Sequence, residues 1–495
     1  METALSFTQS VLNFIFTYLF LINLALAVMV VFFQRKEPKS VWTWLLILYF
    51  LPIIGFILYL LIGTDMHKRK IFRGKEIEDR LSSLISNQSF GIKNREFGGG
   101  SEAKASEIIN SYSDLIIYNL ETSGAILTDQ NEIDIIVDGK EKFKKLIEDL
   151  KKAEKSIHFQ YYIIRDDELF ASICEVLREK IKAGVDVRIL YDCIGSVQFK
   201  EKRWQALRNE GFQIIGFFPA LFRRLHLRIN YRNHRKIVVI DSRVAYIGGF
   251  NVGREYIGKN ENFGYWRDSH LRIDGEAVSA LQARFILDWN HAAPKNHLSL
   301  DEYLTGIVYN RKGSCAAQII SDGPDTRIQN IRDNYLRLIS KARKNIYIQT
   351  PYFIPDDSII SALMIAIYSG ISVNIMIPDK PDHQFVYWAT YSHIGEMVLA
   401  GANCYTYAKG FIHAKVMVVD EEVICCGTAN MDIRSFSLNF EVNATIYDQE
   451  KAEEMTAIFI EDIKHCHRLT RDKYLARPLK IRFREQICRI LSPLL

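Results

Sequence analysis

Clustered cysteine is the first feature that this sequence lacks. Its eight Cys are scattered over 495 residues, and no two of them form a C-x-x-C pair. Structural zinc sites and small disulfide-stabilised secreted domains both depend on such clusters. The sequence therefore predicts reduced, mostly buried thiols and no cysteine-based metal site, which favours the cytoplasmic face of a cell.

A strong charge of either sign is also missing. The formal net charge is +5, which is too small for this length to indicate nucleic acid as a partner. With 48% hydrophobic and 24% charged residues, the composition excludes a disordered or collagen-like chain. The length provides enough apolar material for two or three domains.

Charge is wholly absent from two stretches near the N-terminus, residues 11–33 and 41–63. At about 1.5 Å per residue, each stretch is long enough to cross about 30 Å of hydrocarbon. No Lys or Arg precedes Arg35, so the first stretch lacks the basic region of a cleaved signal peptide. We therefore predict a transmembrane helical hairpin over residues 1–66; the alternative is a buried or re-entrant hairpin.

The second stretch carries signals for its shape and orientation. Pro52 and Gly55 predict a kink, and Trp42 and Trp44 are expected near one membrane interface. More basic residues follow the hairpin than lie in its loop, which favours a cytoplasmic position for the rest of the chain. The loop holds Arg35, Lys36 and Lys39, whereas the following segment holds Lys68, Arg69, Lys70, Arg73 and Lys75.

The remaining chain divides into a connector and two lobes. A basic, polar connector is expected over residues 67–120, followed by a first lobe over 121–300 and a second over 301–495. Strand-like runs alternate with helical patterns in the first lobe, which is typical of an α/β sheet. The expected strands are residues 157–164, 187–191, 214–218, 237–240 and 270–273, and the expected helices are 169–183 and 277–290.

The second lobe repeats the first. The sequence SIHFQ at residues 156–160 is echoed by NIYIQ at 345–349, and residues 183–189 are echoed by 369–375. Both copies then continue into one motif, His-x-Lys-x4-Asp-x6-Gly-(Gly/Thr)-x-Asn, which indicates an internal duplication. The first copy supplies His234, Lys236, Asp241 and Asn251, and the second supplies His413, Lys415, Asp420 and Asn430.

Strand geometry separates the roles within each motif. Side chains two residues apart on a strand share a face, so His234 and Lys236 are expected to point the same way. Asp241 and Asp420 are candidate catalytic residues of the two motifs, but Asp241 has the opposite parity, which favours a role in organising the end of the strand over direct contact with the reacting group. The same argument applies to the second copy. Thr428 stands where the first copy has Gly249, so the two lobes are chemically unequal.

Two imidazoles, two ammonium groups and two amides brought together suit a phosphodiester substrate, without a metal. The lysines and asparagines would hold the non-bridging oxygens. One His would attack phosphorus, and the other would protonate the leaving alcohol. A carboxylate behind each imidazole would fix its tautomer, and Asp268 and Glu441 follow the two motifs at a suitable distance. The alternative is that these two acids lie on the surface.

The doubled motif resembles the phospholipase D superfamily, and the chain as a whole resembles the bacterial cardiolipin synthase family. The resemblance is carried by Leu51–Gly55, Trp266–Asp268, Gln349–Phe353, His413–Lys415, Asn430–Phe436 and the terminal Ser492–Leu495. It implies an α/β fold in which the N-terminal hairpin precedes two pseudo-twofold-related lobes that share one active site. It also implies a bacterial cell membrane location, with several membrane passes.

The reaction implied by this resemblance is reversible phosphatidyl transfer between two phosphatidylglycerols, which gives cardiolipin and glycerol without metal, nucleotide or other cofactor. The intermediate would be a phosphatidyl-histidine. We favour His234 as the nucleophile and His413 as the acid and base, and the opposite assignment stays open.

Two further segments have the basic and apolar composition of an interfacial element on anionic lipid. Residues 217–236 lead into the first motif, and residues 471–495 end the chain. The alternatives are a solvated loop for the first segment and a tail helix packed on its own lobe for the second. The membrane-facing interpretation predicts phosphatidylglycerol and an anionic membrane as partners.

Three other functions use some of the same residues. A membrane-bound phospholipase D would pass the intermediate to water or to another alcohol. A nuclease of the same superfamily would gain nothing from the hairpin. A lipid-binding scaffold without activity would be expected to lack a His or Lys of one motif, and both motifs are intact.

Overall fold

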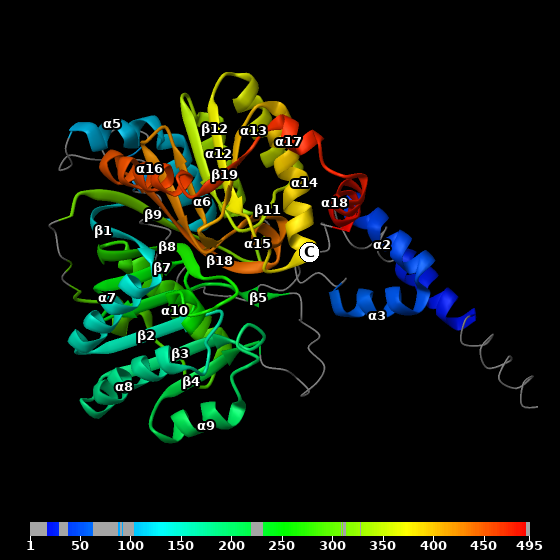
Figure 1. Cartoon of the computed structure of the whole chain (residues 1–495). Coiled ribbons are helices and arrows are strands. Elements are labelled where there is room, and N and C mark those ends of the chain that lie inside the picture. Colours follow the sequence, from blue (N-terminus) through cyan, green and yellow to red (C-terminus); the bar gives the residue numbers. More distant parts are fainter. Residues whose placement is uncertain are drawn as a thin grey trace, which may run out of the picture.

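Two α/β lobes, one above the other, make up the body of the computed structural model (Figure 1). The structure describes residues 17–28, 38–62, 88–89, 92, 103–218, 231–307, 309, 313–326 and 328–491. The expected hairpin, connector and C-terminal tail lie partly outside these ranges.

The first lobe is a mixed sheet covered by helices. Three strands at one edge are parallel to one another, and the remaining strands pair antiparallel. The order is β4 (Gln213–Phe217), β3 (Asp186–Asp192), β2 (Ser156–Tyr161), β6 (Ile237–Ile240), β7 (Val244–Gly248), β8 (Tyr265–Gly275) and β1 (Thr128–Asp138). Its helices include α7 (Gly139–Lys152), α8 (Glu168–Lys182), α9 (Glu201–Asn209) and α10 (Val278–Ala292).

The second lobe repeats this order strand by strand. Three parallel strands again precede an antiparallel set. The strands are β13 (Asn403–Tyr407), β12 (Ser372–Pro378), β10 (Asn345–Gln349), β15 (Val416–Val419), β16 (Val423–Gly427), β18 (Asn439–Tyr447) and β9 (Cys315–Asp322), with β19 (Cys466–Leu469) at the outer edge. Helices α12 (Asn330–Lys341), α13 (Asp357–Tyr368), α14 (Gln384–Ala400) and α16 (Gln449–Ile463) accompany them. The strands and helices expected in the first lobe are thereby confirmed, and so is the repeat.

The strand preceding each His-x-Lys pairs with the opposite lobe. The short β5 (Arg232–Asn233) runs parallel to β18 of the second lobe. Its counterpart β14 (Gly410–Ile412) runs parallel to β8 of the first lobe. The edge strands β1 and β9 also pair with each other. The two lobes are therefore joined by reciprocal strand pairing.

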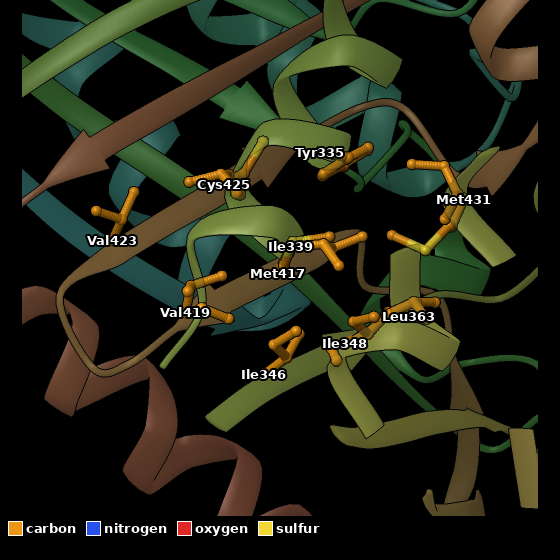
Figure 2. Close-up of a cluster of buried hydrophobic side chains, with 14 of the residues drawn as sticks. Tyr335, Ile339, Ile346, Ile348, Leu363, Met417, Val419, Val423, Cys425 and Met431 are labelled. Atoms are coloured by element: carbon orange, nitrogen blue, oxygen red, sulfur yellow. The ribbon is translucent and has the colours of Figure 1, made fainter. Parts of the chain in front are cut away.

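Apolar strands that are buried on both faces form the interior of each lobe. In β15, all four residues from Val416 to Val419 are buried. Figure 2 shows their neighbourhood, where Met417 and Val419 lie among side chains from β10 and α12. This packing fixes the strand that directly follows the second His-x-Lys.

Part of the expected connector is folded into the second lobe. Helices α5 (Ala103–Ser111) and α6 (Ser113–Ser123) lie within or just beyond residues 67–120. Leu115 and Ile116 of α6 are fully buried in the core of the second lobe. The Asn119 amide donates to Asn334 Oδ1 at 2.9 Å. The chain therefore passes through the second lobe before it enters the first.

Two helices replace the single helix expected for residues 41–63. Helix α2 (Pro38–Phe50) ends one residue before α3 (Pro52–Ile62) begins. In one straight helix, Trp44 and Tyr59 would be about 22 Å apart, but their ring centroids lie 5.3 Å apart. Pro52 has no N–H and its ring crowds the preceding turn, so the helix breaks there. In the part of the chain that the structure describes, no helix has the length and hydropathy needed to cross a bilayer.

The C-terminal tail is a helix docked on the second lobe. Helix α18 (Leu479–Leu491) follows the short α17 (Arg471–Leu475) and packs against α14. Cys488 is buried on the docked face, and Glu485 accepts from Arg477 at 2.8 Å. The opposite face leaves four large apolar side chains exposed, namely Leu479, Phe483, Ile487 and Ile490.

Candidate active site

Each motif histidine is held by a strand of the opposite lobe. His234 follows β5, and its N–H donates to the Phe440 carbonyl of β18 at 3.0 Å. His413 follows β14, and its N–H donates to the Arg267 carbonyl of β8 at 2.7 Å. The His-x-Lys segments are therefore short links between a strand paired with the opposite lobe and a strand of their own sheet.

The two carboxylates also come from the opposite lobe. Glu441 of the second lobe lies 2.9 Å from His234 Nδ1, and Asp268 of the first lobe lies 2.6 Å from His413 Nδ1. Both carboxylates are completely buried, so they are not surface acids. A carboxylate at Nδ1 favours the tautomer with its proton on that nitrogen, which leaves the Nε2 lone pair available. The reciprocal strand pairing thus gives each imidazole its partner.

The hydrogen-bond donors and the packing around the two carboxylates differ. Thr428 Oγ1 donates to Glu441 Oε2 at 2.5 Å, and Asn439 Nδ2 donates to Oε1 at 3.1 Å. Asp268 instead accepts from the Ser269 N–H at 2.8 Å. It also packs so closely on Gly249 that a Cβ there would overlap its carboxylate.

Both motif lysines are buried beside the histidines. Lys236 Nζ donates to the His234 carbonyl at 2.6 Å, and Lys415 Nζ lies 2.9 Å from His413 Nδ1. Burial lowers the pKa of Lys236 to about 7 and that of Lys415 to about 8. Nearby carboxylates, Glu441 and Asp268 among them, partly oppose this shift.

Electrostatic coupling joins the two motifs into one cluster. Burial lowers the pKa of His234 to about 4, and the charges of Lys236 and Lys415 contribute to that shift. Burial and Lys415 lower the pKa of His413, with a further contribution from Lys236. Burial alone would raise the pKa of Asp268, but Lys415 and His413 lower it. The site is therefore arranged for neutral imidazoles and ionised carboxylates at neutral pH.

The motif aspartates lie at the far end of their strands. Asp241 accepts from the backbone N–H groups of Glu154, Lys155 and Ser156 at 2.7–2.8 Å. Asp420 makes the corresponding bonds to Arg343, Lys344 and Asn345. Each Asp begins a tight turn in which two consecutive residues have positive φ, a conformation that Asp tolerates better than most residues. They organise the sheet and do not touch the histidines.

The two motif asparagines have different surroundings. Asn251 Oδ1 accepts from the Ile163 N–H at 3.1 Å, and its Nδ2 donates to the Tyr256 hydroxyl at 3.2 Å. Asn430 Nδ2 donates to Asp432 at 3.3 Å, while its buried Oδ1 has no hydrogen-bond partner among the residues that the structure describes. The Asn251 amide thus makes more hydrogen bonds within its own lobe than the Asn430 amide does.

An aromatic side chain lies beside each histidine, a position that was not predicted from the sequence for Tyr162 or Trp266. The Tyr162 ring lies 4.9 Å from that of His234, and the Trp266 ring lies 5.3 Å from that of His413. The repeat could have indicated Tyr162, because Gln160 and Gln349 each precede a Tyr by two or three residues.

The Arg235 side chain is buried inside the protein, although it was expected in a membrane-facing segment. Its guanidinium donates to Asp288 at 2.6 Å and to the Asp322 carbonyl at 2.8 Å, and it is 1% exposed. Of the other arginines in that segment, Arg232 is described and half-buried, and Arg223, Arg224 and Arg228 lie outside the described residues. Within the described ranges, no group of three or more His, Cys, Asp or Glu is placed to hold a metal ion.

Comparisons with known proteins find a family match that includes both motifs. The family model described as "Cardiolipin synthase, PLD-like domain" matches residues 146–289 and 335–463, which contain both motifs. A second model, the phospholipase D-nuclease N-terminal region, matches residues 21–63.

Two similar relatives extend over the whole chain. The "Major cardiolipin synthase ClsA" of Bacillus subtilis strain 168 is 45% identical over 98% of this chain and all of its own length. The "Cardiolipin synthase" of Staphylococcus aureus strain Mu50 is 46% identical over 100% of this chain and 99% of its own. Among solved structures, a phosphatidylserine synthase of Haemophilus influenzae Rd KW20 has a TM-score of 0.59 at 15% identity. That match covers 79% of this chain and all of the other, and it supports the fold alone.

The fold and the doubled site are those of a phospholipase D-like phosphatidyltransferase. Within that class, the chain belongs to the cardiolipin synthase family.

Proposed function

We propose that this enzyme joins two phosphatidylglycerols into cardiolipin and releases glycerol. One observation carries the proposal: two buried imidazoles, each with its Nδ1 on a carboxylate of the opposite lobe, share one electrostatic cluster with two buried lysines. Such a pair provides both a nucleophile and an acid for a single phosphate.

In the first half-reaction, the Nε2 lone pair of one histidine attacks phosphorus of the donor lipid. A P–N bond forms and the P–O bond to the headgroup glycerol breaks. The other histidine, protonated when the anionic lipid binds, gives its proton to the departing glycerol oxygen. We propose His234 as the nucleophile because its pKa of about 4 keeps it unprotonated.

In the second half-reaction, the headgroup hydroxyl of another phosphatidylglycerol attacks the phosphatidyl-histidine. A P–O bond forms, the P–N bond breaks, and the second histidine takes the hydroxyl proton. The Lys236 and Lys415 ammonium groups hold the non-bridging oxygens, which gain negative charge in each transition state. The amide nitrogens of Asn430 and Asn251, which are hydrogen-bond donors, complete the phosphate surroundings.

We place the site at the surface of the bacterial cytoplasmic membrane, on the cytoplasmic side, with the N-terminal segment as a multi-pass anchor. The exposed face of α18 supports contact with anionic lipid, because Lys480, Arg482 and Arg484 accompany its apolar side chains. In Figure 1, α18 lies on the same side of the molecule as α2 and α3.

Liposome binding tests this placement. Phe483→Asp should weaken binding of the full-length protein to vesicles containing phosphatidylglycerol, whereas Lys464→Ala, on the exposed end of α16, should not. Equal binding of both variants would remove α18 from the membrane-facing surface.

Incubation of the detergent-purified enzyme with phosphatidylglycerol alone tests the reaction. Cardiolipin and glycerol in equal amounts are expected. Phosphatidic acid and glycerol would instead indicate a membrane-bound phospholipase D, which uses the same residues and passes the intermediate to water.

A further inference from the structure

Trp266 carries a buried hydrogen-bond donor that the protein does not use. Its side chain, on β8, is 7% exposed, and the indole Nε1–H has no acceptor among the residues that the structure describes. An indole nitrogen can only donate, so this hydrogen bond has to come from an acceptor outside the protein. Native proteins keep few buried polar groups unpaired, and each one calls for an explanation.

This donor lies beside His413. The centroids of the Trp266 and His413 rings are 5.3 Å apart. Asp268, two residues further along β8, brings its Oδ2 to 2.6 Å from His413 Nδ1. The other printed ring contacts of the indole, at centroid distances of 4.9–5.7 Å, are with Tyr256, Phe263 and Phe411. Aromatic packing therefore fixes the indole next to the reacting imidazole.

The second lobe has a different donor at the same position. Asn439 corresponds to Trp266, because each directly precedes the residue whose carbonyl accepts from a motif histidine N–H. Asn439 Nδ2 donates to the carboxylate of Glu441 at 3.1 Å. Asp268, the carboxylate of the first lobe, instead accepts from the Ser269 N–H at 2.8 Å. The donor of the second lobe thus supports a carboxylate, whereas Trp266 has no such task.

We propose that the Trp266 Nε1–H donates a hydrogen bond to the headgroup alcohol of the lipid, at the hydroxyl next to the reacting oxygen. This inference rests on the proposed function, in which His413 exchanges a proton with the reacting oxygen. The alcohol therefore lies against His413 in both half-reactions, first as the departing glycerol and then as the headgroup of the acceptor. In both, the middle carbon of the glycerol carries a hydroxyl whose oxygen can accept from the indole.

The same hydrogen bond selects among alcohols. Water and simple alcohols have no second hydroxyl, so they leave the buried donor unpaired. A site with such a donor disfavours an analogue that lacks the matching acceptor. Trp266 therefore favours glycerol headgroups, both as the leaving group and as the acceptor.

Transfer of the phosphatidyl group from phosphatidylglycerol to free labelled alcohols tests this role in the full-length enzyme. We would compare glycerol with 1,3-propanediol, which lacks only the middle hydroxyl. Trp266→Phe keeps an aromatic ring but removes the donor. Trp289→Phe is the matched control, because Trp289 is a buried residue of α10 whose Nε1 already donates to the Asn296 carbonyl at 2.8 Å.

The ratio of kcat/KM for glycerol to that for 1,3-propanediol should fall about fivefold to thirtyfold in Trp266→Phe, since one hydrogen bond to glycerol is lost. It should not change in Trp289→Phe. An unchanged ratio in Trp266→Phe, or an equal loss with both alcohols, would overturn the proposal. If Trp266→Phe does not fold, the wild-type enzyme decides: a preference for glycerol supports the hydrogen bond, and equal use of both alcohols overturns it.

Failure of the proposed function gives a different result. Wild-type enzyme that yields phosphatidic acid and no cardiolipin would overturn the synthase reaction but not the contact of Trp266 with the leaving alcohol. That contact would then be measured by hydrolysis of phosphatidylglycerol against phosphatidyl-1,3-propanediol. The same fall in the ratio in Trp266→Phe is expected, and an unchanged ratio would overturn the contact.

Discussion

The two halves of the active site share a backbone design but differ in side chains. His234 is backed by Glu441, whose carboxylate accepts from Thr428, and Tyr162 lies beside it. His413 is backed by the shorter Asp268, which packs on Gly249, and Trp266 lies beside it. A duplicated framework thus positions two imidazoles symmetrically, while substitutions around them allow the two histidines to take different parts in one reaction.

The largest loss of activity should follow substitution of the histidines, since both halves of the site are needed for the reaction. His234→Ala and His413→Ala should each lower cardiolipin formation by about a thousandfold or more, because nucleophile and acid act on the same phosphate. Product formation from labelled phosphatidylglycerol measures this. Substantial turnover by either variant would contradict a shared site.

Trapping the phosphatidyl-histidine intermediate would separate the roles of the two histidines. Acid-quenched labelling should place the phosphatidyl group on His234, and His234→Ala, which lacks the proposed nucleophile, should carry no label. Label on His413 would reverse the two assignments and leave the site itself unchanged.

The next largest loss of activity should follow substitution of the two carboxylates. Glu441→Gln and Asp268→Asn keep the side-chain shape but remove the charge that orients each imidazole, so kcat should fall about a hundredfold or more. Because the partners are exchanged between lobes, Glu441→Gln should slow the formation of the label on His234 more than Asp268→Asn does. Asp149→Asn, an ion pair remote from the histidines, controls for loss of a buried charge. Equal effects of all three variants would make the carboxylates structural.

The lowered pKa of the lysines predicts that kcat/KM changes about tenfold per pH unit on the alkaline side. The pKa of Lys236 is lowered to about 7, so the free enzyme loses the ammonium that holds phosphate as the pH rises above 7. kcat/KM should therefore decline on the alkaline side, and Lys236→Arg, whose charge persists, should move that decline to higher pH. An unmoved alkaline limb would show that another group controls it.

The smallest effects should come from the residues that differ between the motifs. Thr428→Ala removes one hydrogen bond to Glu441 and should lower kcat about tenfold, with Thr428→Ser as the conservative rescue. Gly249→Ala forces a Cβ against Asp268 and should cost more than Thr428→Ala. Steady-state rates of the three variants measure this, and a neutral Gly249→Ala would contradict the close packing.

Much of the fold could be predicted from periodicity and repetition. The strand after each His-x-Lys is a continuous apolar run, and both β6 and β15 are buried throughout. Parity predicted that Asp241 and His234 face different surroundings, because alternation along a strand is a local property. The helix break at Pro52 follows from backbone chemistry, but the sequence suggested only a kink, since the return of α3 onto α2 depends on the contact between Trp44 and Tyr59.

The parts that could not be predicted depend on contacts between distant segments. Asp268 and Glu441 were found by their spacing, but each serves the histidine of the other lobe because β5 and β14 pair across the interface. Arg235 resembled a surface charge until Asp288, far along the chain, supplied its partner. Helix α6 was assigned to the connector although Leu115, Ile116 and Leu120 are apolar, because its burial against α12 is visible only in three dimensions.

The reciprocal strand pairing has a consequence for how the chain could be divided. A fragment ending before β9 would retain His234 but leave it without an acid at Nδ1, and the complementary fragment would leave His413 in the same condition. Neither piece would carry a working half of the machinery. Two co-expressed fragments could recover turnover only if they reassembled through the strand pairs between the lobes. The two lobes therefore act as one catalyst even though each has its own sheet.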